Sequence, residues 1–126
     1  MIDKIKKMAK DIFNELGSGH PECVYQKAFE VALRLERIHY ENQRTVPIFY
    51  KNHNVGEEIP DIIIDTGKEK ILVELKSVGA KMGMKEETQV RKYLEVLDIE
   101  QGILINFPQP NAKETPKEPE IVLVKK

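Results

Sequence analysis

The sequence has 126 residues, of which 40% are hydrophobic and 33% are charged, and its formal net charge is -1 at pH 7. This length and balance suit a single folded domain, residues 1–126, and exclude a chain that is disordered throughout. Because the charge is nearly neutral, there is no overall basic field, and any binding to nucleic acid would depend on a local patch.

The cellular location can be inferred from three features. The chain has one cysteine, Cys23, which excludes an internal disulfide and suits a reducing compartment. Residues 1–10 contain lysines but no apolar stretch of signal-peptide length. No apolar run approaches the roughly 20 residues that a membrane span needs. We therefore expect a cytoplasmic protein without a membrane segment.

The first third of the chain predicts two helices. Apolar residues at intervals of three and four predict an amphipathic helix over residues 2–16, which the segment 17–19 (GSG) ends. Pro21 suits the first position of a second helix that extends to about Ile38. The second helix has a broad apolar face, so we expect it to pack closely against a sheet.

The rest of the chain predicts a sheet. Period-two alternation predicts strands over residues 40–51 and 55–65, with a turn at 52–54 and a break at Pro60. A third strand, over residues 71–78, is expected at the centre of the sheet.

The carboxyl-terminal elements complete an α/β fold. A helix over residues 85–97 and a buried strand over 102–107 follow the central strand, and this order predicts a right-handed parallel crossover. The Pro-rich segment 108–119 is expected to be extended, and residues 121–124 could return as an edge strand. The predicted fold is a mixed central sheet flanked by helices.

The segment from Pro60 to Val78 carries the candidate chemistry. Because side chains alternate along a strand, we expect Asp61, Glu74 and Lys76 on one face of an otherwise apolar sheet. Ionised groups there cost free energy unless they pair or hold a metal. Two carboxylates suit a hard cation such as Mg²⁺, and the lysine could position water or offset charge in a transition state. The residues alone leave open a structural ion pair between Glu74 and Lys76.

Five motifs, in the same order along the chain, resemble those of a known family. Pro60-Asp61 and, twelve residues later, Glu74-Leu75-Lys76 resemble the PD-(D/E)xK nuclease motif. Four other segments resemble the motifs of the GxxExxY proteins within that superfamily: 19–25 (GHPECVY), 48–51 (IFYK), 89–94 (QVRKYL) and 102–107 (GILINF).

The resemblance implies a RecB-like, restriction-endonuclease-like core that hydrolyses phosphodiester bonds, with DNA as the expected substrate. It also implies a cofactor, Mg²⁺ or Mn²⁺. The residues implied to hold the metal are Asp61, Glu74, the carbonyl of Leu75 and Glu22 from the preceding helix.

Two further residues would complete the implied site. Lys76 would orient the attacking water and stabilise charge, and Gln89 would reach the site from the following helix. Ordinary explanations also remain open. The helix dipole favours an acid such as Glu22 in the first helical turn, and Gln89 suits a solvated helix face. Tyr25 and Tyr93 are interpreted as packing residues with a hydroxyl at the rim of the site.

The sequence departs from the family pattern just before the motif aspartate. The family often has a basic residue there, whereas this chain has Glu57, Glu58 and Ile59. This acidic approach is expected to weaken phosphate binding more than metal binding. Local cations could contact a nucleic-acid backbone or simply face solvent. They are Lys51, Lys76, Lys81, Lys85, Arg91 and Lys92.

The sequence therefore predicts a metal-dependent nuclease that acts on DNA. The alternative is a catalytically inactive nuclease-fold module that binds nucleic acid or a protein partner. A homodimer formed through the apolar strand 121–124 is a further possibility.

Overall fold

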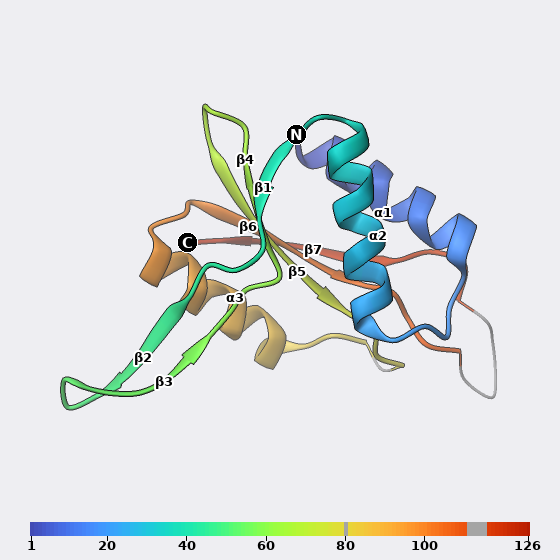
Figure 1. Ribbon diagram of the computed structural model, residues 1–126. Coiled ribbons are helices and arrows are strands. Elements are labelled where there is room, and N and C mark those ends of the chain that lie inside the picture. Colours follow the sequence, from blue (N-terminus) through green and yellow to red (C-terminus); the bar gives the residue numbers. More distant parts are fainter. Residues whose placement is uncertain (80, 111–115) are drawn as a thin grey trace.

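The elements form a mixed α/β architecture in a computed structural model that describes residues 1–79, 81–110 and 116–126 (Figure 1). Five strands form the main sheet in the order β1-β4-β5-β6-β7, and β2 and β3 form a separate two-stranded sheet. The elements are α1 (Ile2–Leu16), α2 (Glu22–Leu35), β1 (His39–Glu41), β2 (Val46–Tyr50), β3 (His53–Glu58), β4 (Ile62–Asp65), β5 (Lys70–Lys76), α3 (Met84–Leu97), β6 (Gln101–Asn106) and β7 (Glu120–Lys125).

The central strand of the main sheet is β5, as the sequence predicted. It pairs antiparallel with β4 and parallel with β6, and α3 makes the connection between β5 and β6. The outer pairs, β1 with β4 and β6 with β7, are antiparallel. The prediction of a mixed sheet with a parallel crossover is therefore confirmed, and so is the edge strand at the carboxyl-terminal end.

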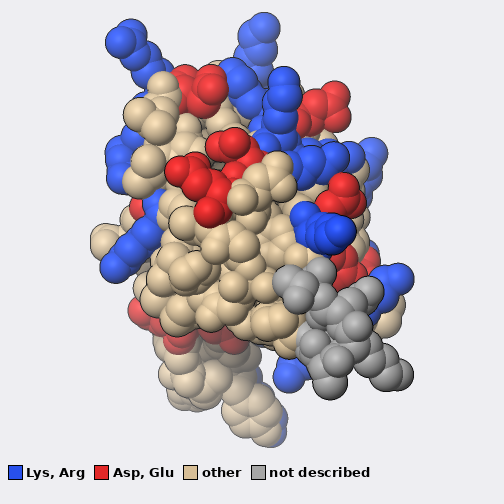
Figure 2. All heavy atoms as spheres, turned by 90° about the vertical axis from the view of Figure 1, so that its right-hand side faces the viewer, with Lys and Arg blue, Asp and Glu red and all other residues tan. Residues whose placement is uncertain are grey.

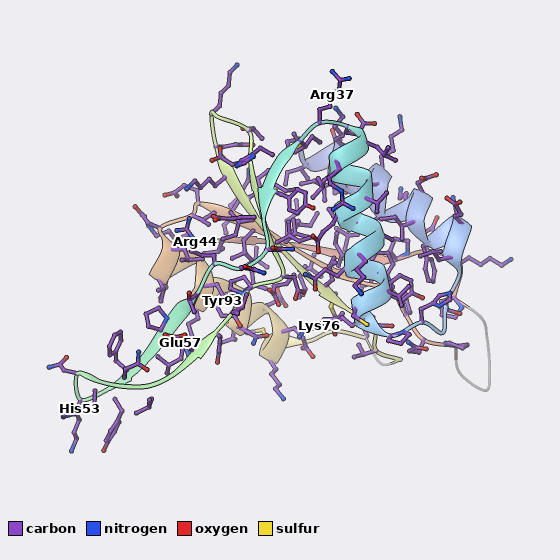
Figure 3. The ribbon with its side chains drawn as sticks, viewed as in Figure 1. Arg37, Arg44, His53, Glu57, Lys76 and Tyr93 are labelled. Atoms are coloured by element: carbon purple, nitrogen blue, oxygen red, sulfur yellow. The ribbon has the colours of Figure 1, made fainter. Side chains whose placement is uncertain are left out.

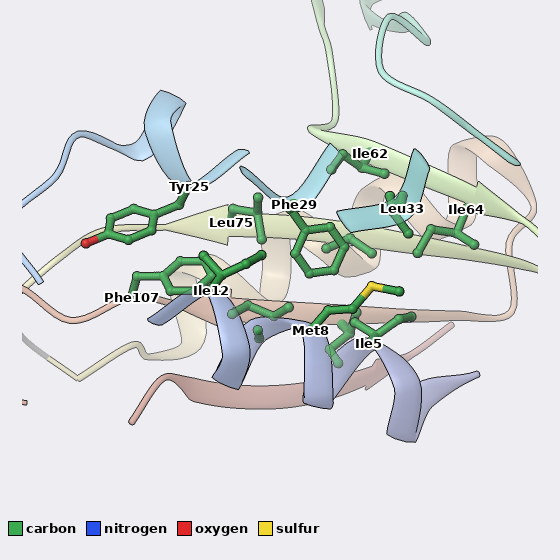
Figure 4. Packing of buried hydrophobic residues seen from close by; sticks show 14 of the residues in the cluster. Ile5, Met8, Ile12, Tyr25, Phe29, Leu33, Ile62, Ile64, Leu75 and Phe107 are labelled. Carbon is green, nitrogen blue, oxygen red and sulfur yellow. The ribbon is translucent and has the colours of Figure 1, made fainter. Parts of the chain in front are cut away.

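Helices cover both faces of the sheet. On one face, α1 and α2 contribute Ile5, Phe13, Phe29 and Leu33 to a core that also contains alternate residues of β4, β5 and β6 (Figure 4). On the other face, α3 packs against the intervening strand residues. The buried residues on that face include Ile63, Leu72, Val90, Leu94 and Leu104. Because both faces are covered, a charged side chain on β5 can reach water only near the end of the strand.

The second helix ends earlier than the sequence predicted. It stops at Leu35 rather than near Ile38, because Arg37 adopts a left-handed conformation with φ of 57°. The Ile38 N–H then donates to the Leu33 carbonyl at 2.9 Å, which is the 6→1 hydrogen bond of a Schellman motif at a helix C-terminus. The backbone turns away from the helix and enters β1.

Two predicted strands were wrong in extent. The stretch 40–51 divides into β1 and β2, and the stretch 55–65 divides into β3 and β4. In each stretch, one part belongs to the main sheet and the other to the two-stranded sheet. Alternation of side chains cannot distinguish these cases, because both sheets require the same period of two.

The two-stranded sheet is a hairpin that projects from the body of the molecule (Figure 1). We refer to its residues, 46–58, as the β2–β3 arm. Its turn is formed by Lys51 and Asn52, both with positive φ (48° and 65°), which is typical of a two-residue hairpin loop. The predicted turn at 52–54 was therefore misplaced, since His53 and Asn54 already belong to β3.

The Pro-rich segment is only partly described. Residues 108–110 and 116–119 lie outside helices and strands, and the other residues of the segment that was predicted to be extended, 111–115, lie outside the described residues. Across the described residues, no helix combines the length and apolar character needed to cross a membrane.

Candidate functional site

Two carboxylates meet where β4 begins and β5 ends. Among the described residues, Glu74 is the only charged side chain that is buried, with 5% of its surface exposed. Ile62 lies opposite Val73 in the antiparallel pair, so one further step along this register places Asp61 opposite Glu74. Both side chains therefore lie on the face that α3 covers.

The two acids are held by reciprocal contacts with the backbone. The Asp61 N–H donates to Glu74 Oε1 at 2.8 Å, and the Leu75 N–H donates to Asp61 Oδ2 at 2.8 Å. The structure records no other hydrogen bond from a described residue to either carboxylate. One oxygen of each acid is fixed in this way, and the second oxygen of each accepts no hydrogen bond from a described residue.

The electrostatics of this pair are unfavourable when both acids are ionised. Burial, followed by the charge of Asp61, raises the pKa of Glu74 to about 8. Burial is also the main cause that raises the pKa of Asp61 to about 6, with a contribution from Glu22, although the Leu75 N–H and Lys76 oppose the rise. A bound cation would remove this cost, because it would neutralise the adjacent carboxylates.

A surface cleft of about 450 Å³ lies between α2 and α3, where β5 ends. Lys76 lines it from the strand, Glu22 from the first turn of α2, and Gln89 from α3. Figure 3 shows Lys76 in this position, between the two helices. The charges of Lys76 and Glu22 both influence the Asp61 carboxyl, so the cleft and the acid pair form one electrostatic unit.

A buried tyrosine explains how Glu22 is positioned. The ring of Tyr25 stacks on Phe107, with 4.4 Å between ring centroids and 5° between ring planes. Its hydroxyl donates to the Gly17 carbonyl at 2.6 Å and so fixes the loop before α2. Gly19 in that loop has φ of 102°, a conformation that glycine adopts without strain. The glycine and tyrosine of the GHPECVY segment therefore set the direction in which α2 begins.

The same loop is attached to the end of β5. The Ser77 hydroxyl donates to the His20 carbonyl at 3.0 Å, and the Gln109 amide donates to the same carbonyl at 3.0 Å. Gln109 also donates to the Ser77 hydroxyl at 2.6 Å. Three parts of the chain that are distant in sequence thereby fix the positions of Glu22 and Lys76, which both line the cleft.

On the α3 side, Gln89 and Tyr93 are coupled. The Gln89 amide donates to the Tyr93 hydroxyl at 3.0 Å. Burial, above all, and then the nearby carboxylates of Glu58 and Glu74 raise the pKa of Tyr93 well above its usual value. Tyr93 is thus a packing residue whose hydroxyl, held by Gln89, faces the acids of the site.

The five predicted side chains of the site fall into two groups, a linked pair of acids and three residues that line the cleft. Asp61 and Glu74 are linked through the backbone, and Glu22, Lys76 and Gln89 surround the adjacent cleft. In the described ranges, no group of three or more His, Cys, Asp or Glu side chains is arranged to hold a metal ion. Glu22 is therefore near enough to influence the acid pair without forming a three-acid cluster with it.

Sequence reasoning missed two residues that contact or influence the site. The Gln26 amide donates to the Asp61 carbonyl at 3.1 Å and to Glu30 at 3.4 Å. Glu30 in turn raises the pKa of Asp61, as the smallest of its causes. Gln26 follows Glu22 by four residues, so it lies on the same helical face, and this spacing was the available signal.

The predicted cations divide between the cleft and other surfaces. Lys76, Lys85 and Lys92 line the cleft together with acids that include Glu22 and Glu58. On the face shown in Figure 2, Lys and Arg side chains are interspersed with Asp and Glu side chains, and the middle of the face carries neither. On this face, a nucleic acid would therefore meet local cations rather than a continuous basic surface.

Comparisons with known proteins agree with this architecture. A family model described as the PD-(D/E)XK nuclease superfamily matches residues 1–118. Among solved structures, the crystal structure of SSO0001 is similar, with a TM-score of 0.62 and 17% sequence identity over 83% of this chain and 50% of that chain. The chain thus spans about half the length of that protein, and this likeness supports the fold alone. No curated protein matches the sequence.

Proposed function

Because the chain belongs to the PD-(D/E)XK nuclease superfamily, we propose that it is a divalent-cation-dependent nuclease that hydrolyses DNA. The observation that best supports this proposal is the pair formed by Asp61 and Glu74, which are fixed through one oxygen each beside an open cleft. The additional motifs favour the GxxExxY group within the superfamily. The architecture is consistent with the restriction-endonuclease-like fold of this superfamily.

The two acids fit a hard cation. Mg²⁺ and Mn²⁺ bind carboxylate oxygens, and Mg²⁺ usually keeps several waters and takes only one or two carboxylates from a protein. Asp61, Glu74 and the Leu75 carbonyl would hold the ion, and Glu22, which forms no three-acid cluster with the pair among the described residues, would have to turn toward the ion to bind it. Burial and mutual repulsion raise both pKa values, so a cation would stabilise the ionised pair. When bound, the ion would supply Lewis-acid stabilisation of charge on the phosphate.

The remaining residues supply positioning and charge. Lys76 follows Glu74 by two residues on β5, so it lies on the same face and can donate a hydrogen bond to the attacking water. Its ammonium group also offsets negative charge that develops on the phosphoryl oxygens. Gln89, on the opposite wall of the cleft, can donate to a phosphate oxygen or to the same water.

The direct test is cleavage of linear and supercoiled DNA with Mg²⁺ or Mn²⁺, compared with cleavage in EDTA. We expect Lys76→Met to reduce the rate by roughly 100-fold or more, as removal of a group that stabilises the transition state does. The matched control is Lys68→Met, an exposed lysine in the turn at the other end of β5. Parental cleavage by a folded Lys76→Met protein would contradict the assignment.

One observation favours a second function, binding without hydrolysis. The described residues contain no three-acid cluster, and Glu22 and Glu58 make the cleft less favourable for phosphate. A protein of this kind would bind nucleic acid or a protein partner through the nuclease fold. It would show no cation-dependent cleavage on any DNA substrate, whereas the nuclease would lose its cleavage in EDTA.

A further inference from the structure

The β2–β3 arm is the part of the molecule that the acid pair and the cleft do not explain. It leaves the body as a hairpin, and His53 lies near its far end (Figure 3). Three apolar side chains of the arm are largely exposed: Phe49 by 60%, Tyr50 by 62% and Val55 by 61%. Exposed aromatic groups at the end of a projecting element indicate contact with another molecule.

The arm is anchored at its base and ordered at its tip. Val46 is fully buried among residues of α3 and the sheet, and Ile48 packs partly against the same cluster. Beyond Ile48 a register shift occurs, and the strands then pair as far as Tyr50 opposite His53. A two-residue loop closes the hairpin. The aromatic groups are therefore presented by paired strands rather than by an irregular loop.

The two rings lie on opposite faces of the hairpin. Phe49 pairs with Asn54, and Tyr50 pairs with His53. Because successive side chains point to opposite faces, each face of the hairpin presents one benzenoid ring. The Lys51 ammonium lies 5.4 Å from the centroid of the Tyr50 ring. One face of the tip thus combines a ring, an imidazole and a cation.

The charge at the tip of the arm favours an anionic partner, whereas the base of the arm is acidic. Within the arm, residues 46–56 contain Lys51 and no Asp or Glu, although acids make up 21 of the 126 residues of the chain. The acids begin at Glu57 and Glu58, and Glu58 lines the cleft beside Lys76. The arm is therefore continuous with the cleft, so one extended ligand could contact both.

We propose that the β2–β3 arm binds single-stranded nucleic acid by stacking unpaired bases on Tyr50 and Phe49. This inference rests on the proposed function, because the strand would continue from the arm into the cleft. Base stacking on aromatic rings tolerates any sequence and requires few cations. Duplex binding instead depends on many phosphate contacts, and the arm supplies only Lys51.

The test measures binding separately from cleavage. A fluorescent 20-nucleotide single strand and its duplex are titrated with the 126-residue protein in EDTA, and anisotropy is recorded. We expect the single strand to bind more tightly than the duplex. Phe49→Ser/Tyr50→Ser should weaken single-strand binding by roughly tenfold or more, since each lost stack costs a substantial part of the affinity. The variant Phe49→Tyr/Tyr50→Phe should retain it.

A matched control removes exposed apolar groups elsewhere. Val31 and Leu35, on the outer face of α2, are both exposed, and Val31→Ser/Leu35→Ser should bind the single strand as the parent does. Thermal melting checks that the serine variants fold. Equal single-strand binding by the parent and by Phe49→Ser/Tyr50→Ser would overturn the proposal. So would tighter binding of the duplex, or a parental dimer that this variant converts to a monomer.

The failure of this inference can be told from the failure of the proposed function. Cleavage with Mn²⁺ and binding in EDTA are independent readouts. Metal-dependent cleavage with no arm-dependent binding would overturn the role of the arm alone. Arm-dependent binding with no cleavage by the parent would support the arm and would contradict the nuclease assignment.

Discussion

Replacing Glu74 by glutamine should stabilise the protein in the absence of metal. Glu74 is buried and lies opposite Asp61, and these two facts raise its pKa from 4.5 to about 8. Glutamine has nearly the same shape, and its amide oxygen can still accept the Asp61 N–H that Glu74 Oε1 accepts at 2.8 Å. The substitution therefore removes the titration and keeps the contact.

The size of the effect follows from the difference between folded and unfolded states. Above pH 4.5 the unfolded chain releases the Glu74 proton, whereas the folded protein keeps it up to about pH 8. The stability of the parent therefore falls as the pH rises through this window. Each pH unit costs about 1.4 kcal/mol, so the cost at pH 7 is at most about 3 kcal/mol. Part of the rise in the pKa of Glu74 comes from the charge of Asp61, which itself titrates in this range. We therefore expect Glu74→Gln to recover only about 2 kcal/mol of the free energy of unfolding at pH 7.

The assay is urea unfolding and thermal melting of Glu74→Gln and its parent in EDTA at pH 4, 5, 7 and 8. The expected gain at pH 7 corresponds to roughly 8 °C in melting temperature and should vanish near pH 4. The control is Glu15→Gln, the same substitution at an exposed position on α1. It should change the melting temperature little at any pH, because an exposed side chain is solvated in both states.

A gain in stability must also coincide with a loss of metal binding. Mn²⁺ should raise the melting temperature of the parent and have little effect on Glu74→Gln, because one proposed ligand is gone. The reasoning would be refuted if Glu74→Gln were no more stable than the parent at pH 7 in EDTA. A gain of equal size at pH 4 and pH 8 would refute the assignment of the gain to the titration of Glu74.

Further predictions concern the second acid and two packing positions. Asp61→Asn should abolish the Mn²⁺-induced rise in melting temperature, and in the parent this rise should be larger at pH 8 than at pH 6, because binding requires deprotonated carboxylates. Tyr25→Phe removes the 2.6 Å hydrogen bond to the Gly17 carbonyl, so urea unfolding should show a loss of about 1–2 kcal/mol. In Gly102→Ala, the new Cβ would lie 3.2 Å from the Leu72 carbonyl oxygen, and the resulting overpacking should cost about 1–3 kcal/mol by the same assay. Unchanged stability of either variant would contradict the packing described for it.

Local patterns in the sequence predicted the helices and the strands β5, β6 and β7 because those features depend on local periodicity. The errors occurred where the chain passes between two sheets. Residues 40–51 and 55–65 were each predicted as one strand, yet the chain leaves the main sheet after Glu41 and returns to it at Ile62. The polar run at 41–45 and the break at Pro60 mark both crossings, but alternation alone cannot say which strands pair.

In the candidate site, too, some contacts follow from local patterns in the sequence and others do not. The spacing between Asp61 and Glu74 predicted their proximity, because a hairpin between adjacent strands fixes which residues lie opposite each other. The contact of Gln109 with the His20 carbonyl was not predictable, since it joins residues 89 positions apart. Such contacts depend on how the helices and loops pack, which no local period encodes.

The position of Glu74 on β5 follows from the way that α3 covers this face of the sheet. Leu72, two residues before Glu74, is fully buried beneath α3, whereas Lys76, two residues after it, lines the cleft. A carboxylate at Leu72 would have neither a route to water nor a partner, and ionising it would cost several kcal/mol. At Lys76, a carboxylate would be solvated and would lack the raised pKa that makes cation binding favourable. Glu74 is the position on this face of β5 where burial perturbs an acid and an adjacent cleft still admits a ligand.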